Sequence, residues 1–146
     1  MTTSNIQAPS NTAERSPLRM RLNRADPGPL DGAWWPQTRN LEVEMADLVD
    51  NFPSAVGRVD RAVFSPPDWL PPSRRIRTAR GFVKVGSFPR DDTHVVVLRL
   101  ASGEMLTMLV VPPTTSPNQA DRFMKAATDT GSRLNARAVL ALPPES

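Results

Sequence analysis

The spacing of hydrophobic residues changes along the chain, and each change predicts a new element. Residues 18–22 alternate between apolar and polar side chains, which predicts a half-buried strand with a cationic outer face. Between residues 40 and 52, apolar side chains recur every three or four positions, which predicts a helix with Thr38 or Asn40 as its N-cap. Pro53 then ends this helix, because proline cannot continue the backbone hydrogen-bond ladder.

Four stretches rich in β-branched or aromatic residues follow this helix, and each predicts a strand. They are residues 57–64, 74–88, 94–100 and 105–111. Gly81 is expected to mark a bulge in the second of them. After these strands, Ser116, Pro117 and Gln119 form a typical helix start, with Ser116 as N-cap and Gly131 as the expected C-cap.

These elements predict an α+β fold with the order β-α-β-β-β-β-α. Hairpin-like successions favour a largely antiparallel sheet of about five strands, with both helices packed on one face. The length of 146 residues suits one domain, which we place at residues 17–131. Residues 1–16 are polar and predict a disordered tail, and residues 132–146 predict a C-terminal tail or a short helix.

Composition excludes several kinds of site. The chain has no cysteine, which excludes a disulfide framework and a thiol nucleophile. It has one histidine, and we assign no metal, cofactor or catalytic residue. No apolar run approaches the ~20 residues of a membrane-spanning helix, and no secretory leader is recognisable. The expected location is therefore cytoplasmic, with no membrane partner.

The net charge of +3 hides an uneven distribution. Residues 31–53 hold one arginine and five acidic residues, a net charge of −4, whereas residues 54–90 hold eight basic and two acidic residues, a net charge of +6. A basic middle segment beside an acidic helix is the main electrostatic clue to a partner.

Two of the three tryptophans stand together in the stretch Asp31-Gly32-Ala33-Trp34-Trp35-Pro36. Neighbouring residues in extended backbone point to opposite sides, so Trp34 and Trp35 are not expected to enter the same core. Each indole either packs in the core or forms a contact surface for a partner.

The tryptophan stretch, together with Gly57-Arg58-Val59, Trp69 and Leu109-Val110-Val111-Pro112-Pro113, resembles an actinobacterial family of unknown function. The resemblance covers roughly residues 17 to 128. Members of that family carry Arg-Ser-Arg-Asp-Leu where this chain has Gln37-Thr38-Arg39-Asn40-Leu41. The family implies no activity, so the resemblance adds no mechanism.

The first candidate site is a basic cluster in the 74–84 region, with Arg58 and Arg61 upstream. Its members are Arg74, Arg75, Arg77, Arg80 and Lys84. Alternation along a strand would place several of these cations on one face, where they can bind phosphates, and Trp69 would add a stacking surface for single-stranded nucleic acid. The alternative is a solvated strand face, partly neutralised by the acidic helix.

Two further candidates are weaker. Asp91 and Asp92 precede His94, so they can form either a polar turn or a site in which a carboxylate orients a general base. Trp35 and Trp69 either cap the open end of the core or form an aromatic groove for an extended peptide.

Three functions follow from these candidates. The leading hypothesis is a non-enzymatic module that binds a protein partner through Trp34, Trp35, Trp69 and the basic strand, because tryptophan and arginine dominate binding hot spots. The alternatives are nucleic-acid binding by strand 74–84 and a ligand site or enzyme centred on His94. The oligomeric state is left open.

Overall fold

The computed structural model describes residues 17–23, 28–65, 69–70, 72–79, 81–87, 94–129 and 133–142. The strands of this part are β2 (Met20–Leu22), β3 (Gly32–Trp34), β4 (Val59–Phe64), β5 (Arg75–Thr78), β6 (Gly81–Ser87), β7 (Val95–Leu100) and β8 (Met105–Val110). The helices are α1 (Leu41–Asn51), α2 (Pro117–Thr128) and α3 (Ala136–Leu140). The predicted α+β class is therefore confirmed, although its details differ.

The described strands form one mixed sheet in the order β2-β3-β8-β7-β4-β6-β5. β3 pairs with β8 and β4 pairs with β6 in parallel, whereas the other neighbours are antiparallel. The sheet has seven strands, so the prediction of about five largely antiparallel strands undercounted them and missed both parallel pairs. The strands predicted at residues 94–100 and 105–111 are confirmed as the antiparallel pair β7 and β8, which lies in the interior of the sheet.

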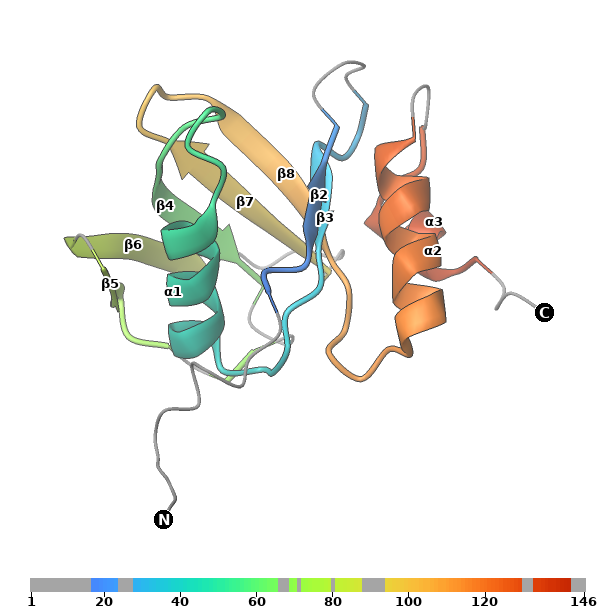
Figure 1. The fold of residues 1–146 in the computed structure, drawn as a ribbon, viewed down its shortest axis with the longest axis horizontal. Helices are drawn as coiled ribbons and strands as arrows, with labels where there is room; N and C mark the ends of the chain where they lie inside the picture. The colour runs from blue at the N-terminus through green and yellow to red at the C-terminus, as the bar shows by residue number, and fades with distance from the viewer. Residues whose placement is uncertain are drawn as a thin grey trace, which may run out of the picture.

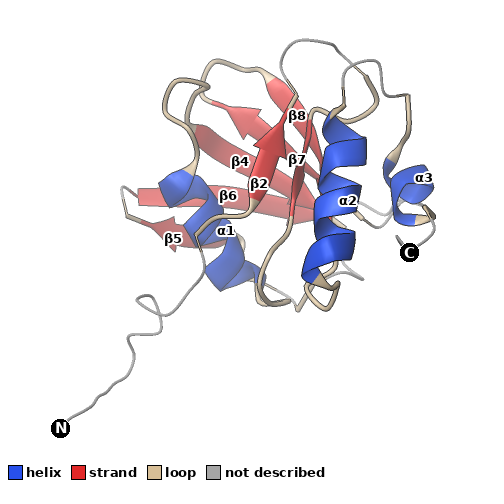
Figure 2. Ribbon diagram, turned by 45° about the vertical axis from the view of Figure 1, so that its right-hand side comes forward, coloured by secondary structure: helices blue, strands red, loops and turns tan. Residues whose placement is uncertain are grey.

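The helices cover opposite faces of the sheet, which corrects the prediction that they share one face. Figure 1 shows α1 on one side of β2 and β3, and α2 with α3 on the other side. Alternate residues of β8 enter separate cores: Leu106 and Met108 pack with α1, whereas Leu109 packs with α2 and α3. In the turned view of Figure 2, α2 and α3 lie at one end of the sheet, away from β5 and β6.

Helix α1 begins at Asn40, one of the two predicted N-cap candidates, whose side chain accepts a hydrogen bond from the Val43 amide at 3.4 Å. Glu44 in the first turn is buried and accepts from the Gln37 amide at 3.0 Å and from the Thr38 hydroxyl at 2.8 Å. These bonds anchor the segment that enters the helix, and the carboxylate also suits the positive end of the helix dipole.

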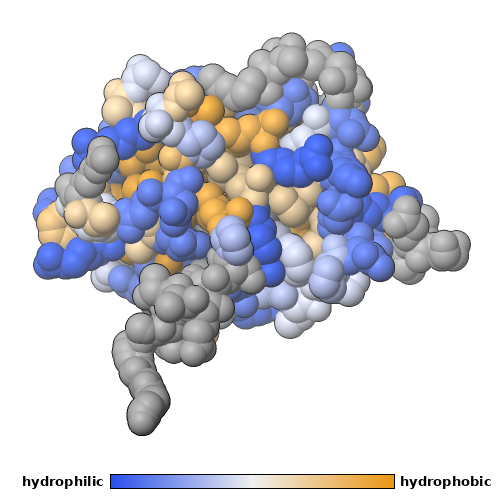
Figure 3. All heavy atoms as spheres, in the orientation of Figure 1, coloured by the Kyte–Doolittle hydropathy of each residue, from blue (hydrophilic) through white to orange (hydrophobic). Residues whose placement is uncertain are grey.

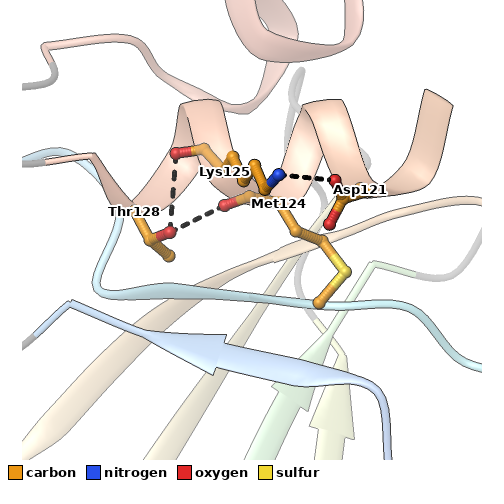
Figure 4. A network of polar contacts seen from close by, with 4 residues as sticks. All are labelled: Asp121, Met124, Lys125 and Thr128. Carbon is orange, nitrogen blue, oxygen red and sulfur yellow. Dashed lines mark hydrogen bonds and ion pairs between the residues drawn. The ribbon is translucent and has the colours of Figure 1, made fainter. Parts of the chain in front are cut away.

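Helix α2 also begins as predicted, with Ser116 accepting a hydrogen bond from the Gln119 amide at 3.4 Å. Figure 4 shows Met124 directed toward the sheet and the pair Lys125–Asp121, with an N–O distance of 2.9 Å, along the helix. Seen from the side of β2, hydrophilic residues lie over α1 and α2, and hydrophobic residues gather between them (Figure 3). The buried residues of α2 are Ala120, Phe123, Met124 and Ala127, which have the spacing of an amphipathic helix.

Two short strands were not predicted. No strand was predicted in the tryptophan stretch, but Gly32–Trp34 forms β3. The predicted single strand 74–88 is a hairpin of β5 and β6, and Gly81, with a φ of +146°, begins β6 after the reversal. Residues 136–140 form α3, within the segment expected to be a tail or a short helix. The expected N-terminal tail and the expected cap at Gly131 lie outside the described residues.

Candidate functional site

Residues of the tryptophan stretch have structural roles in holding β3 in the sheet. The carboxylate of Asp31 accepts a hydrogen bond from the Thr107 amide at 2.8 Å, which ties β3 to β8. A Cβ atom on Gly32 would lie 2.5 Å from the carbonyl oxygen of Arg21, so only glycine fits between β2 and β3. Ala33 is fully buried beneath α2 and α3.

Trp34 and Trp69 stack on each other inside the core beneath α1. Their ring centroids lie 5.5 Å apart, with an angle of 27° between the planes. Their exposed fractions are 1% and 6%. The amide of Leu70 donates to the carbonyl oxygen of Arg39 at 3.0 Å, which holds the Trp69 segment against the start of α1. Neither indole is on the surface, so neither can be a contact platform in this conformation.

Trp35 points to the opposite side, as the sequence predicted, and is half-buried against the second core. The guanidinium carbon of Arg19 lies 3.6 Å from the centroid of the Trp35 ring. Arg19 also donates to the carbonyl oxygens of Trp35 and Pro36, at 3.0 and 2.9 Å. The predicted surface combining Trp34, Trp35 and Trp69 with the arginines is therefore not formed: two indoles are sealed in the core and the third is clamped by Arg19.

The cations gather instead on the half of the sheet face that α2 and α3 leave open. In the strand register, Arg99 of β7 lies opposite Arg61 of β4, Arg61 opposite Lys84 of β6, and Lys84 opposite Arg75 of β5. Met105 of β8 continues the row beyond Arg99. We call Arg99, Arg61, Lys84 and Arg75 the cation row. It crosses four adjacent strands at ~4.8 Å per step, so it is about 14 Å long.

The cation row separates two open hollows on the sheet surface. The first has a volume of about 380 Å³ and includes Val63, Arg74 and Gly86 in its lining, together with the cations of β4, β5 and β6. The second has a volume of about 330 Å³ and is lined by Asp60, Phe82 and all four cations of the row. The surface therefore offers a charged ridge with a shallow depression on each side.

In the described part of the chain, no acidic side chain forms an ion pair with the cation row. None of its four side chains forms an ion pair or a side-chain hydrogen bond there. Asp60 lines the second hollow, but its Oδ1 atom is buried without a hydrogen-bond partner. Like charges placed directly opposite across strands destabilise a sheet, so the row is costly to the fold by itself.

Sequence comparison places this chain in a family. Residues 18–127 match the Family of unknown function (DUF5994). The chain belongs to this family. No curated protein and no solved structure matches the chain.

The DUF5994 match contains the tryptophan stretch, the cation row and both hollows. Within the described ranges of this DUF5994 chain, no helix is long and apolar enough to cross a membrane. The same ranges hold no group of three histidine or acidic side chains that could bind a metal ion.

Most residues of the predicted basic cluster of the DUF5994 chain lie close together on the sheet. Arg75, Arg77 and Lys84 lie on the open face, and Arg74 lines the first hollow, whereas Arg80 is outside the described residues. Arg61, noted only as an upstream cation, occupies the middle of the row.

Arg99 and Phe82 belong to the open face but were not predicted as site residues. Arg99 is the single charge in a strand that is otherwise hydrophobic, and Phe82, 51% exposed, lies opposite Arg77 across the β5–β6 hairpin. An isolated cation in a hydrophobic strand was the available signal for Arg99, because alternation places it on the face opposite Leu98 and Leu100.

The histidine hypothesis receives little geometric support in the DUF5994 domain. His94 is half-buried beside a pocket whose lining includes Trp69, Pro36 and Pro112. The cavity volume is about 20 Å³, enough for one water molecule but not for a substrate. Asp91 and Asp92 lie outside the described residues.

Proposed function

We propose that this protein binds single-stranded nucleic acid across the open face of its sheet. The observation that carries the proposal is the cation row: four adjacent strands place Arg99, Arg61, Lys84 and Arg75 in register, with no carboxylate paired to them in the described residues. A ligand with regularly spaced phosphates would supply the missing negative charge.

The surroundings of the cation row favour a single strand as the ligand. Binding without a groove-reading helix requires cations along the backbone and flat apolar surface for unpaired bases. Phe82 and Met105 are 51% and 53% exposed on this face, and Val63 lines the first hollow. Because α2 and α3 cover the neighbouring strands of the same face, they limit the binding surface to β7, β4, β6 and β5.

A protein partner with an acidic segment is the other ligand that a cationic surface could bind. The burial of Trp34 and Trp69 removes the aromatic anchors that favoured a protein partner at the sequence level. The exposed side chains that remain suit phosphate contacts by arginine and stacking on one aromatic ring. The proposed ligand is therefore a nucleic acid, and binding of an acidic polypeptide in its place would contradict the proposal.

Fluorescence polarisation with labelled eight-nucleotide DNA and RNA tests the proposal. The wild-type protein should bind at low salt, and log K should fall against log salt with a slope of about −2.8, because each of four phosphate contacts contributes roughly −0.7 for single strands. The variant with Arg61→Gln and Arg99→Gln should bind more weakly, with a slope reduced by about 1.4.

The matched control for this experiment is Lys125→Gln, which removes an exposed cation on α2. It should leave both affinity and slope unchanged. Equal loss in the control would show a general charge effect, and it would overturn the proposal. Absence of oligonucleotide binding in low salt, tight binding of duplex instead of single strands, or binding of polyglutamate alone would also overturn it.

A further inference from the structure

The second hollow has the composition of a nucleobase subsite. The β-bulge in β4, where the register shifts between Val59 and Arg61, places the extra residue Asp60 beside Arg61. Both side chains line the hollow that also holds Phe82. Bulges occur preferentially next to functional sites because they redirect a side chain out of the regular alternation. Here the redirected side chain is that of Asp60, the one carboxylate among the described residues of a hollow whose other charged residues are cations.

Phe82 supplies a stacking surface in this hollow. Half of the residue is exposed, and the guanidinium carbon of Arg77 lies 5.4 Å from the ring centroid. An unpaired base that stacks on the phenyl ring would therefore meet a cation as well as an aromatic face. The cross-strand step from Lys84 to Arg75 lies beside this pair, so the phosphates of the same nucleotide strand can reach the cation row.

Asp60 supplies a hydrogen-bond acceptor at the same place. Its carboxylate has no hydrogen-bond partner in the described residues. Its Oδ1 atom is buried, so Oδ2 is the oxygen that can accept from a ligand in the hollow. A carboxylate beside phosphates would be unfavourable unless a donor satisfies it. The exocyclic amino groups of cytosine, adenine and guanine are donors. Thymine and uracil have no amino group, and their single N3–H donor lies between two carbonyl oxygens, which would repel the carboxylate.

We infer that the Asp60–Phe82 hollow selects an amino-bearing base, cytosine, adenine or guanine, over thymine or uracil. This inference rests on the proposed binding of single-stranded nucleic acid and deepens it by naming a specificity-determining residue. Phe82 holds the base by stacking, and Asp60 accepts the amino hydrogen. The cation row fixes the backbone without regard to sequence.

Competition between unlabelled eight-nucleotide oligo-dC and oligo-dT tests the inference on the full chain. Wild-type protein should bind oligo-dC about tenfold more tightly, the discrimination that one well-placed base contact supplies. Asp60→Asn should bring the two affinities within about twofold, because the amide can both donate and accept. Phe82→Ala should weaken both ligands roughly tenfold, and Phe82→Trp should restore them.

The outcomes separate this inference from the proposed function. If neither oligonucleotide binds, the proposed function fails and the inference fails with it. If both bind equally, and Arg61→Gln with Arg99→Gln weakens them, the proposed function stands and the base subsite is refuted. The base subsite is also refuted if Asp60→Asn strengthens both ligands equally, since the carboxylate would then act only as a repelling charge.

Discussion

Two glycines show how differently the same residue type can be constrained. Gly32 in β3 is closed in by the Arg21 carbonyl oxygen, at 2.5 Å from the position of an added Cβ atom, and by the side chain of Leu22 at 2.9 Å. Gly86 in β6 has no atom within 4 Å of its added Cβ. The first glycine sets the distance between β2 and β3, and the second leaves the floor of the first hollow open.

We expect Gly32→Ala to lower the free energy of unfolding by about 1–3 kcal/mol, because the backbone of β2 must move away. Gly86→Ala is the matched control in the same sheet. It should change stability little or raise it by roughly 0.5–1 kcal/mol, because alanine costs less entropy than glycine. Urea denaturation measures both values, and equal effects of the two substitutions would contradict the packing argument.

The tryptophan stretch also shows what the residue pattern could reveal. Extended geometry correctly predicted that Trp34 and Trp35 face opposite sides of the chain. Whether either ring was exposed depended on what packs over it, namely Trp69 for one ring and Arg19 for the other. These partners are distant in sequence, so local spacing held no information about them.

At the scale of elements, α1 organises the edge of the sheet through its carboxylates. Glu42 accepts from the backbone amide and hydroxyl of Ser73, and Asp50 accepts from the Ala79 amide at 2.9 Å. These residues flank the edge strand β5, so the helix holds both ends of that strand. Two carboxylates of α1, Glu42 and Asp50, thus bind the segments that flank β5. They do not pair with the cation row, whose side chains can still bind a ligand.

Glu44 is the carboxylate on which the start of α1 depends. Glu44→Ala would leave the Gln37 amide and the Thr38 hydroxyl without their acceptor, and we expect unfolding free energy to fall by about 1–3 kcal/mol. Asp121→Ala, which removes an exposed carboxylate from α2, should cost less than ~0.5 kcal/mol. Thermal and chemical denaturation of the pair would refute this role for Glu44 if the two losses were equal.

The elements differed in how far sequence could predict them. Helices α1 and α2 carry their own caps and amphipathic spacing, so both were predicted. Strands β3 and β5 have three and four residues and are stabilised by partners elsewhere in the sheet, so their local patterns were too short to identify them. The strand order also depends on non-local pairing, which is why the neighbour relation of Arg61 and Arg99 was not foreseen.

At the scale of the whole molecule, the two faces of the sheet are used differently. Among the described residues, α1 covers one face over a continuous core, and α2 with α3 cover one end of the other face. The uncovered part holds the cation row and its two hollows. Helices at one end of a face therefore support the fold while leaving the other end of that face accessible to a ligand.

If the cation row is retained for binding, it should reduce the stability of the free protein. We expect Arg61→Gln to raise the free energy of unfolding by about 0.2–1 kcal/mol, because Arg61 has a like charge opposite it on each side. The gain should shrink as salt rises, since added ions screen exposed charges. Denaturation at low and high ionic strength measures it, and a loss of stability at both would assign Arg61 a structural role instead.

The hydrogen bonds between Asp31 and Thr107 impose an order on folding during synthesis. These residues are 76 positions apart, and among the described strands β2 and β3 join the rest of the sheet through β8. At a ribosomal rate of roughly 5–20 residues per second, the earliest strands wait about 4–15 s for the strand beside which they dock. The beginning of the chain is thus among the last parts to find its place, and the nascent indole of Trp34 has no finished core to enter until then.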